Sequence, residues 1–296
     1  MNKLKYTIGL LAIICLISGF FAFSVAYKAL ASDSDNVDTQ VNVLNQTSTF
    51  STMAFNNNGD ITLTEDTTTT VPCQALINNP DGYEDVSSTR AVYYAASTTV
   101  NCTPNDNDCY EAACTLSGGA GDYVTSTCST DMWFHAVSGT WYCQIIVTDN
   151  SNAVTERTSD PETVLELSAL GADSLLDYGN VAANSDSTGD HIVNAHTSGN
   201  VPIDVNLSGT SMVNGAQSIP VSMQKYSTSS FVYGPSYPSL SGNVVLLDLN
   251  EVADNKPTTH PSDVNWAVYW QIHIPAGTPQ GPYTGSSTYA AMLDTD

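Results

Sequence analysis

Basic residues are scarce in this sequence. Its 296 residues include seven Lys and Arg against thirty Asp and Glu, and three of the seven, Lys3, Lys5 and Lys28, lie within the first 31 residues. Nucleic acids and anionic lipid surfaces are bound through clusters of Lys and Arg. Only four basic residues follow residue 31, so the sequence excludes both as partners of that part of the chain.

The motifs of common catalytic sites are absent as well. The sequence contains no G-x-S-x-G, H-E-x-x-H or C-x-x-C motif and no phosphate-binding loop, and its five His occur singly. We therefore expect a protein that is not an enzyme and has no organic cofactor. An extracellular hydrolase with carboxylate catalysis is the alternative, because a catalytic pair of Asp or Glu is defined by geometry and has no fixed spacing.

The first 31 residues differ from the rest of the chain. Lys3 and Lys5 precede an uncharged apolar run from Tyr6 to Val25, and Ala29-Leu30-Ala31 fits a small-x-small cleavage pattern. This order predicts a secretory signal peptide. Because the apolar run is long enough to cross a bilayer, an uncleaved signal-anchor helix is the rival interpretation. Either way we expect residue 32 onward to be extracellular, with membrane contact only through residues 1–31.

Six cysteines follow this segment, and all of them lie between Cys73 and Cys143. An even number in an exported chain indicates a disulfide framework, for which six cysteines allow fifteen connectivities. Apolar residues recur at every second position around both Cys73 and Cys143, which puts each cysteine on the inward face of a strand. We expect these two to join the layers of a sandwich, as in an immunoglobulin domain.

The other four cysteines are assigned by their proximity in the sequence. One pair brackets the polar loop TPNDND, and the other flanks the turn Gly118–Gly121. The sequence therefore predicts three disulfides: Cys73–Cys143, Cys102–Cys109 and Cys114–Cys128.

Strand periodicity dominates the chain after the leader. In the segment 139–152, GTWYCQIIVTDNSN, Trp141, Cys143, Ile145 and Val147 fall on one face, and the segment 266–274 repeats the pattern. No helical period of useful length is present after residue 31. We predict an all-β fold with two tandem β-sandwich, immunoglobulin-like domains after an N-terminal signal or anchor helix.

The boundaries follow from changes in composition. We expect a signal peptide or signal-anchor at 1–31, a polar stalk at 32–58, a disulfide-rich sandwich at 59–158 and a second sandwich at 162–296. The stalk has room for one short strand, at Val41 to Leu44. In the second sandwich, Pro202 predicts that the alternating segment 201–207 is an edge strand, and the last strand is expected at 283–290.

Two stretches carry a resemblance. GTWYCQIIVTDNSNA resembles the closing strands of immunoglobulin-like domains in large bacterial and archaeal surface proteins. HIPAGTPQGPYTGSSTY resembles the end of another sandwich type in such proteins. The resemblance implies a secreted or cell-surface β-sandwich protein, and it implies no catalytic residues.

One loop is a candidate calcium site. Asp106, Asp108 and Glu111, together with Asn105 and Asn107, supply oxygen ligands of the kind that calcium uses. The alternative is a hydrophilic loop with Asx turns that a Cys102–Cys109 disulfide closes.

A second loop is a candidate ligand surface. Tyr226, Tyr233 and Tyr237, with Phe231, lie close together in KYSTSSFVYGPSYP. Exposed rings there would stack on a sugar or contact a protein partner, and buried rings would fix the loop onto the sandwich. The sequence thus favours a non-enzymatic structural or adhesive protein of the cell surface or envelope, whose partners are a surface glycan or another envelope protein. A carbohydrate-binding, lectin-like module is the alternative.

Overall fold

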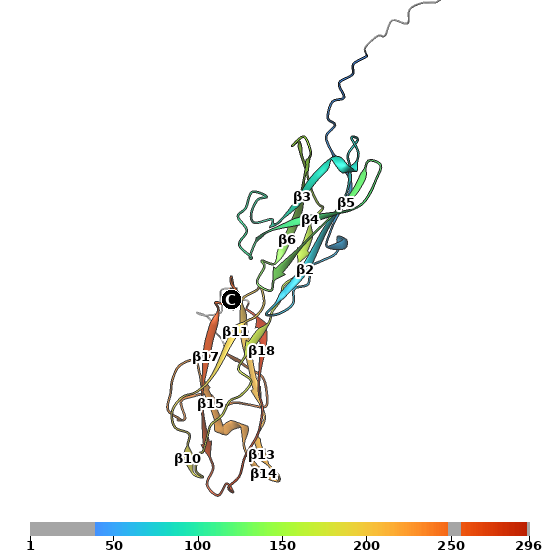
Figure 1. Cartoon of the computed structure of the whole chain (residues 1–296). Helices are drawn as coiled ribbons and strands as arrows, with labels where there is room; N and C mark the ends of the chain where they lie inside the picture. The colour runs from blue at the N-terminus through green and yellow to red at the C-terminus, as the bar shows by residue number, and fades with distance from the viewer. Residues whose placement is uncertain (1–38, 248–255, 295–296) are drawn as a thin grey trace, which may run out of the picture. The chain divides into compact units, whose positions relative to one another are not determined.

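The computed structural model describes residues 39–247 and 256–294 (Figure 1). The predicted signal or anchor segment, 1–31, lies outside these residues. The chain divides into the unit Met1–Leu44 and the compact unit Asn45–Asp296. No helix in the described part is long and apolar enough to cross a membrane. The only helices there are three single 3-10 turns, η1 (Asn56–Asn58), η2 (Tyr83–Asp85) and η3 (Val221–Met223), so the prediction of an all-β fold is confirmed.

The first sandwich has two layers that share one strand. One layer has the order β1-β2-β5-β4 and the other β4-β3-β6-β7, with β8 also paired to β6. Strand β4 belongs to both because its first half pairs with β3 and its second half, from Cys114, pairs with β5. The strands are β1 (Thr49–Phe55), β2 (Thr68–Asn78), β3 (Val86–Ala95), β4 (Cys109–Ala120), β5 (Tyr123–Trp133), β6 (Gly139–Asp149), β7 (Val154–Thr158) and β8 (Glu162–Val164).

Strand β6 carries the inward face that the sequence predicts. Trp141, Cys143, Ile145 and Val147 are all buried in one core, together with the inward residues of β2. The Trp141 indole nitrogen donates a hydrogen bond to the carbonyl oxygen of Val137 at 2.8 Å, so the largest side chain of this core has its polar atom satisfied.

The first sandwich extends beyond its expected limits at both ends. Strand β1 lies inside the stretch that we expected to be a polar stalk, and its last residue, Phe55, is buried in the core. Strand β8 lies beyond the expected end at residue 158, and Val164 is also part of this core. The strand expected at Val41 to Leu44 is not formed. A bulge between Phe50 and Thr52 interrupts the alternation in β1, which explains why its apolar pattern is weak in the sequence.

The second sandwich contains two main sheets. One has the order β9-β11-β17, with β10 and β15 also paired to β17, and the other has the order β16-β12-β18. A small β13-β14 hairpin is separate from both. The strands are β9 (Leu170–Ala172), β10 (Ser185–Asp186), β11 (His191–Thr197), β12 (Ile203–Gly209), β13 (Met212–Asn214), β14 (Gln217–Ile219), β15 (Gln224–Ser227), β16 (Val245–Leu247), β17 (Asn265–Ile274) and β18 (Ser287–Leu293).

The second core forms around β17. Trp266, Val268, Trp270 and Ile272 are buried on one face of it, as their alternation predicts. Two expectations for this sandwich are wrong. Strand β12 is central, because Pro202 lies just before the strand and removes no ladder hydrogen bond from it. The last strand is β18, which begins at Ser287 and not at residue 283.

Candidate functional site

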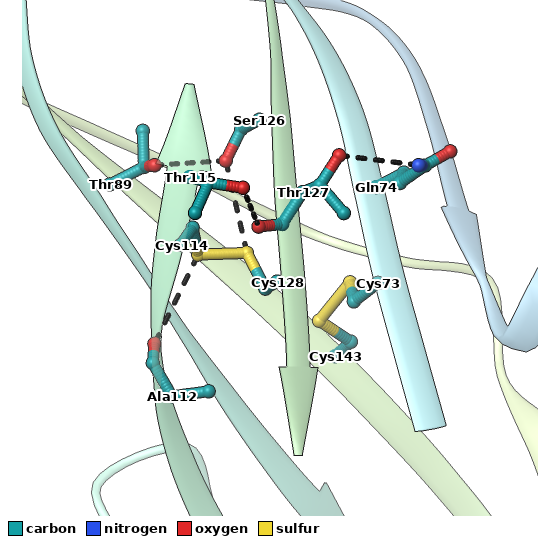
Figure 2. Close-up of a disulfide and its surroundings, with 10 residues drawn as sticks. All are labelled: Cys73, Gln74, Thr89, Ala112, Cys114, Thr115, Ser126, Thr127, Cys128 and Cys143. Atoms are coloured by element: carbon teal, nitrogen blue, oxygen red, sulfur yellow. Dashed lines mark hydrogen bonds between the residues drawn. A yellow bond between two sulfur atoms is a disulfide. The ribbon is translucent and has the colours of Figure 1, made fainter. Parts of the chain in front are cut away.

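Three disulfides tie the first sandwich together, and they are the three pairs that the sequence predicts. Cys73–Cys143 connects β2 in one layer to β6 in the other, and both residues are buried. Cys114–Cys128 joins directly opposite residues of β4 and β5, and Cys128 in turn lies opposite Cys73 in the β2-β5 ladder. Figure 2 shows these two disulfides side by side. Cys102–Cys109 closes the polar loop before β4.

The four basic residues of the described chain all have bonding partners within the protein. Arg90 forms an exposed ion pair with Glu111 at 2.8 Å, and Arg157 donates to the backbone of Phe50 at 3.0 Å. Lys225 donates to the carbonyl oxygen of Tyr237, and Lys256 donates to that of His135. The described surface therefore offers no cluster of unpaired cations for an anionic ligand.

Two of the three candidate calcium carboxylates, Asp108 and Glu111, bond to other side chains of the protein. Glu111 pairs with Arg90. The Asn105 side chain donates to Asp108 and accepts from the backbone nitrogens of Asn107 and Asp108, which is an Asx turn. Among the described residues, no group of three or more His, Cys, Asp or Glu is close enough to hold a metal ion. The calcium site therefore stays a prediction. The Asx turn explains the conformation of this loop without a metal ion.

The aromatic loop is divided between the core and the surface. Tyr226 in β15 is 3% exposed, and its ring lies 5.6 Å from that of Trp270, so it does not belong to a ligand surface. It is buried because β15 pairs with β17 and directs this ring into the second core. Tyr233 and Tyr237 are half-buried. The Tyr233 ring lies 5.7 Å from His273, and that of Tyr237 lies 4.3 Å from Phe231.

The second sandwich contains a cleft of about 840 Å³. Its apolar lining includes Ile219 from β14, Ile272 and Ile274 from β17, and Val181 from the loop 177–183. Its polar part comes from the two loops 177–183 and 278–283. These loops are about 100 positions apart in the sequence, and no spacing pattern relates them, which is why sequence reasoning missed this site.

The polar groups that line the cleft are suited to binding a ligand, and they lack the pair of carboxylates that glycoside hydrolysis uses. Asn180 and Gln280 are exposed amides, and Tyr283 is a half-buried ring whose hydroxyl donates to the carbonyl oxygen of Pro279 at 3.1 Å. Asp177 is the only carboxylate that lines this cleft, and it already accepts a hydrogen bond from the backbone nitrogen of Gly179 at 2.8 Å. Glycoside hydrolysis by the common mechanism needs two carboxylates across the scissile bond.

Sequence reasoning also missed a buried histidine. His135 is 1% exposed, and neither of its ring nitrogens has a hydrogen-bond partner among the described residues. Burial, together with the nearby positive charge of Lys256, lowers the pKa of His135 to about 4. His135 is therefore neutral at physiological pH. A single His gives no signal in the sequence, because its burial depends on the residues packed around it, Trp133 and Phe134 among them.

Comparisons with known proteins give distant likenesses. No family model and no curated protein matches the chain. A solved structure described as the chaperone–tip adhesin complex of CFA/I fimbriae is 10% identical over 82% of this chain and 80% of that one, with a TM-score of 0.30. Four tandem repeats from the extending region of a large adhesion protein are 12% identical over 81% and 50%, with a TM-score of 0.26. The major pilin subunit of Bacillus cereus is 12% identical over 85% and 65%, with a TM-score of 0.24. These scores are too low to carry an argument, so the function is argued from the residues of this chain.

Proposed function

We propose that this is a non-enzymatic protein of the cell surface or envelope whose two sandwiches act as a structural or adhesive element. The observation that carries the proposal is the set of three disulfides. Disulfides persist in oxidising compartments outside the cytoplasm. The Cys73–Cys143 bond joins the two layers inside the core, so such a compartment stabilises the folded state.

Two further observations support this role. The chain is only 12% charged, so its polar surface is mainly neutral and offers few charged groups for catalysis or for anion binding. In the described residues the cleft of the second sandwich is lined by one carboxylate, and no metal-binding group of three acidic, His or Cys residues is present. The proposal therefore does not include an enzymatic activity.

The location can be tested in cells that make the protein. Intact cells are treated with a membrane-impermeant biotin reagent and then fractionated, and the thiols of the protein are probed with maleimide before and after reduction. We expect biotin labelling on intact cells and thiols that react only after reduction. A protein found in the cytoplasm with six maleimide-reactive cysteines beyond residue 31 would refute the proposal.

Glycan binding in the cleft is the second candidate function. The observation that favours it is that the Tyr283 ring, two exposed amides and several apolar side chains line one cleft, a combination typical of small-ligand sites. A glycan array with the wild-type protein and a Tyr283→Ala variant tests it, with Tyr233→Ala as a control outside the cleft. Binding that Tyr283→Ala abolishes and Tyr233→Ala leaves unchanged would support the cleft. An array with no signal, or equal effects of the two variants, would exclude it.

A further inference from the structure

The outer edge of β18 has no partner strand among the described residues. Strand β18 pairs with β12 along its whole length, from Ser287 to Leu293, and forms the edge of the three-stranded sheet β16-β12-β18. Within residues 39–247 and 256–294, no other bridge or backbone hydrogen bond involves it. Alternate backbone N–H and C=O groups of such an edge point outward and can pair with another extended chain.

The β18 edge also lacks the features that normally prevent pairing. Its sequence, STYAAML, has no Lys, Pro or charged side chain, and Met292 and Leu293 are 38% and 40% exposed. Natural edge strands are protected by charge, proline, bulges or a short length. In the first sandwich, β7 carries Glu156 and Arg157, and Arg157 bonds to the backbone of β1. The β7 edge of the first sandwich therefore carries charged side chains that protect it, whereas the β18 edge of the second sandwich does not.

We propose that β18 accepts an added strand, and that its occupant is the segment 39–44 of a second copy of this chain. This inference goes beyond the proposed function, because it concerns self-assembly and applies wherever the protein is located. Adding a strand to an exposed edge is a general mode of recognition in which backbone hydrogen bonds supply the affinity and side-chain pockets supply the specificity.

The segment 39–44, TQVNVL, has the properties of a donor strand. Val41, Val43 and Leu44 are large apolar side chains that are 83%, 83% and 76% exposed. Val41 and Val43 are two positions apart and so lie on the same side of an extended chain. Six extended residues span about 20 Å, which is close to the length of the seven-residue strand β18. The segment forms no regular structure within its own chain.

The neighbouring residues explain why a second copy is the occupant. Asn45, which follows the segment, is held on the first sandwich through a hydrogen bond from Nδ2 to Asp149 Oδ2 at 3.0 Å, and the backbone nitrogen of Gln46 donates to Asp81. Strand β18 belongs to the second sandwich. A donor on one sandwich and an acceptor on the other give a heterologous, head-to-tail contact, which repeats from copy to copy.

Two variants test the donor segment 39–44 and the acceptor strand β18 one at a time. The Val41→Asp/Val43→Asp variant puts charge into the donor and leaves β18 intact. The Ala290→Lys/Met292→Lys variant puts charge on exposed positions of β18 and leaves the donor intact. A Val154→Asp variant, at an exposed position of β7, is the matched control. All four proteins are produced by secretion and purified, and circular dichroism establishes that each is folded.

The mass of each protein is measured by light scattering over a range of concentrations. We expect wild type and Val154→Asp to assemble with increasing concentration, and each double variant alone to stay monomeric. An equal mixture of the two double variants should give a complex of about twice the monomer mass that grows no further, because it has one working donor and one working edge. A monomeric wild type, a mixture that stays monomeric, or assembly that persists in either double variant would overturn the proposal.

Discussion

Arg157 in β7 donates a hydrogen bond from Nη1 to the backbone carbonyl oxygen of Phe50 in β1, at 3.0 Å. These strands are the two ends of the path β1-β2-β5-β4-β3-β6-β7, so this bond connects the open edges of the first sandwich. One long polar side chain thereby satisfies an edge carbonyl that would otherwise be free to pair with another chain.

Removing this bond should increase local opening of β1 and lower the free energy of unfolding of the whole protein only slightly. Because the bond is exposed, we expect Arg157→Gln to cost about 1 kcal/mol. Hydrogen exchange should be faster at the amides of residues 50–55. Arg90→Gln is the control, since it breaks an exposed ion pair that we expect to contribute less than about 1 kcal/mol. Equal exchange rates in wild type and Arg157→Gln would contradict the role of Arg157 at this edge.

The disulfides should differ in their contributions to stability. Cys73–Cys143 has a sequence separation of 70 residues and Cys102–Cys109 one of 7. From loop-closure entropy, replacing the first pair by Ala should cost roughly 4 kcal/mol and replacing the second roughly 2 kcal/mol. Guanidinium unfolding of both double variants measures the difference. Peptide mapping under non-reducing conditions that links Cys73 to Cys102 or Cys109 would contradict the connectivity itself.

Replacing Tyr226 or Tyr233 of the aromatic loop by Ala should lower the stability of the protein by different amounts. Tyr226→Ala removes a ring from the second core beside Trp270, and we expect a loss of about 3 kcal/mol. Tyr233 is half-buried, so Tyr233→Ala should cost about 1 kcal/mol or less. Thermal unfolding of the two variants tests this. Similar losses would show that Tyr226 is not a core residue.

The buried His135 predicts a loss of stability at acid pH. Burial lowers the pKa of His135 from 6.5 to about 4 in the folded protein. The unfolded chain therefore binds a proton at this residue between pH 6.5 and pH 4 while the folded protein does not. The free energy of unfolding is therefore unaffected by His135 above pH 6.5 and falls as the pH decreases toward 4, by about 3 kcal/mol.

A His135→Leu variant isolates this effect. It should flatten the part of the stability profile between pH 6.5 and pH 4 compared with that of wild type. The measurement is the free energy of unfolding in urea at several pH values. A His135→Leu profile as steep as that of wild type would assign the acid sensitivity to other groups.

The sequence predicts best where alternation is regular. Trp141 to Val147 and Trp266 to Ile272 have period-two patterns without interruption, and both segments are central strands with buried inward faces. The prediction was wrong where the backbone departs from that period. The bulge in β1 puts Phe50 out of phase with Met53 and Phe55, so the segment has the composition of a stalk although it is a strand.

Other features depend on contacts that no local pattern encodes. Strand β4 changes layer near Cys114, and alternation gives no sign of this change. At its start, adjacent residues Cys109 and Tyr110 are both buried, in two different clusters. The cleft of the second sandwich combines two distant loops. The position of Pro202, one residue outside β12, decides between an edge and a central strand, and element boundaries are the least certain part of a sequence-based assignment.

Because β18 carries no ionised side chain, assembly through this strand should depend on the salt concentration of the medium. The chain carries a formal net charge of −23, so two copies repel each other, but the strand itself contributes nothing to that repulsion. Repulsion between the bodies acts over about 30 Å at 0.01 M salt and over about 8 Å at physiological ionic strength. Brackish or saline surroundings would let the neutral strands meet, whereas dilute ones would hold the subunits apart, so higher ionic strength would favour the proposed assembly at a given protein concentration.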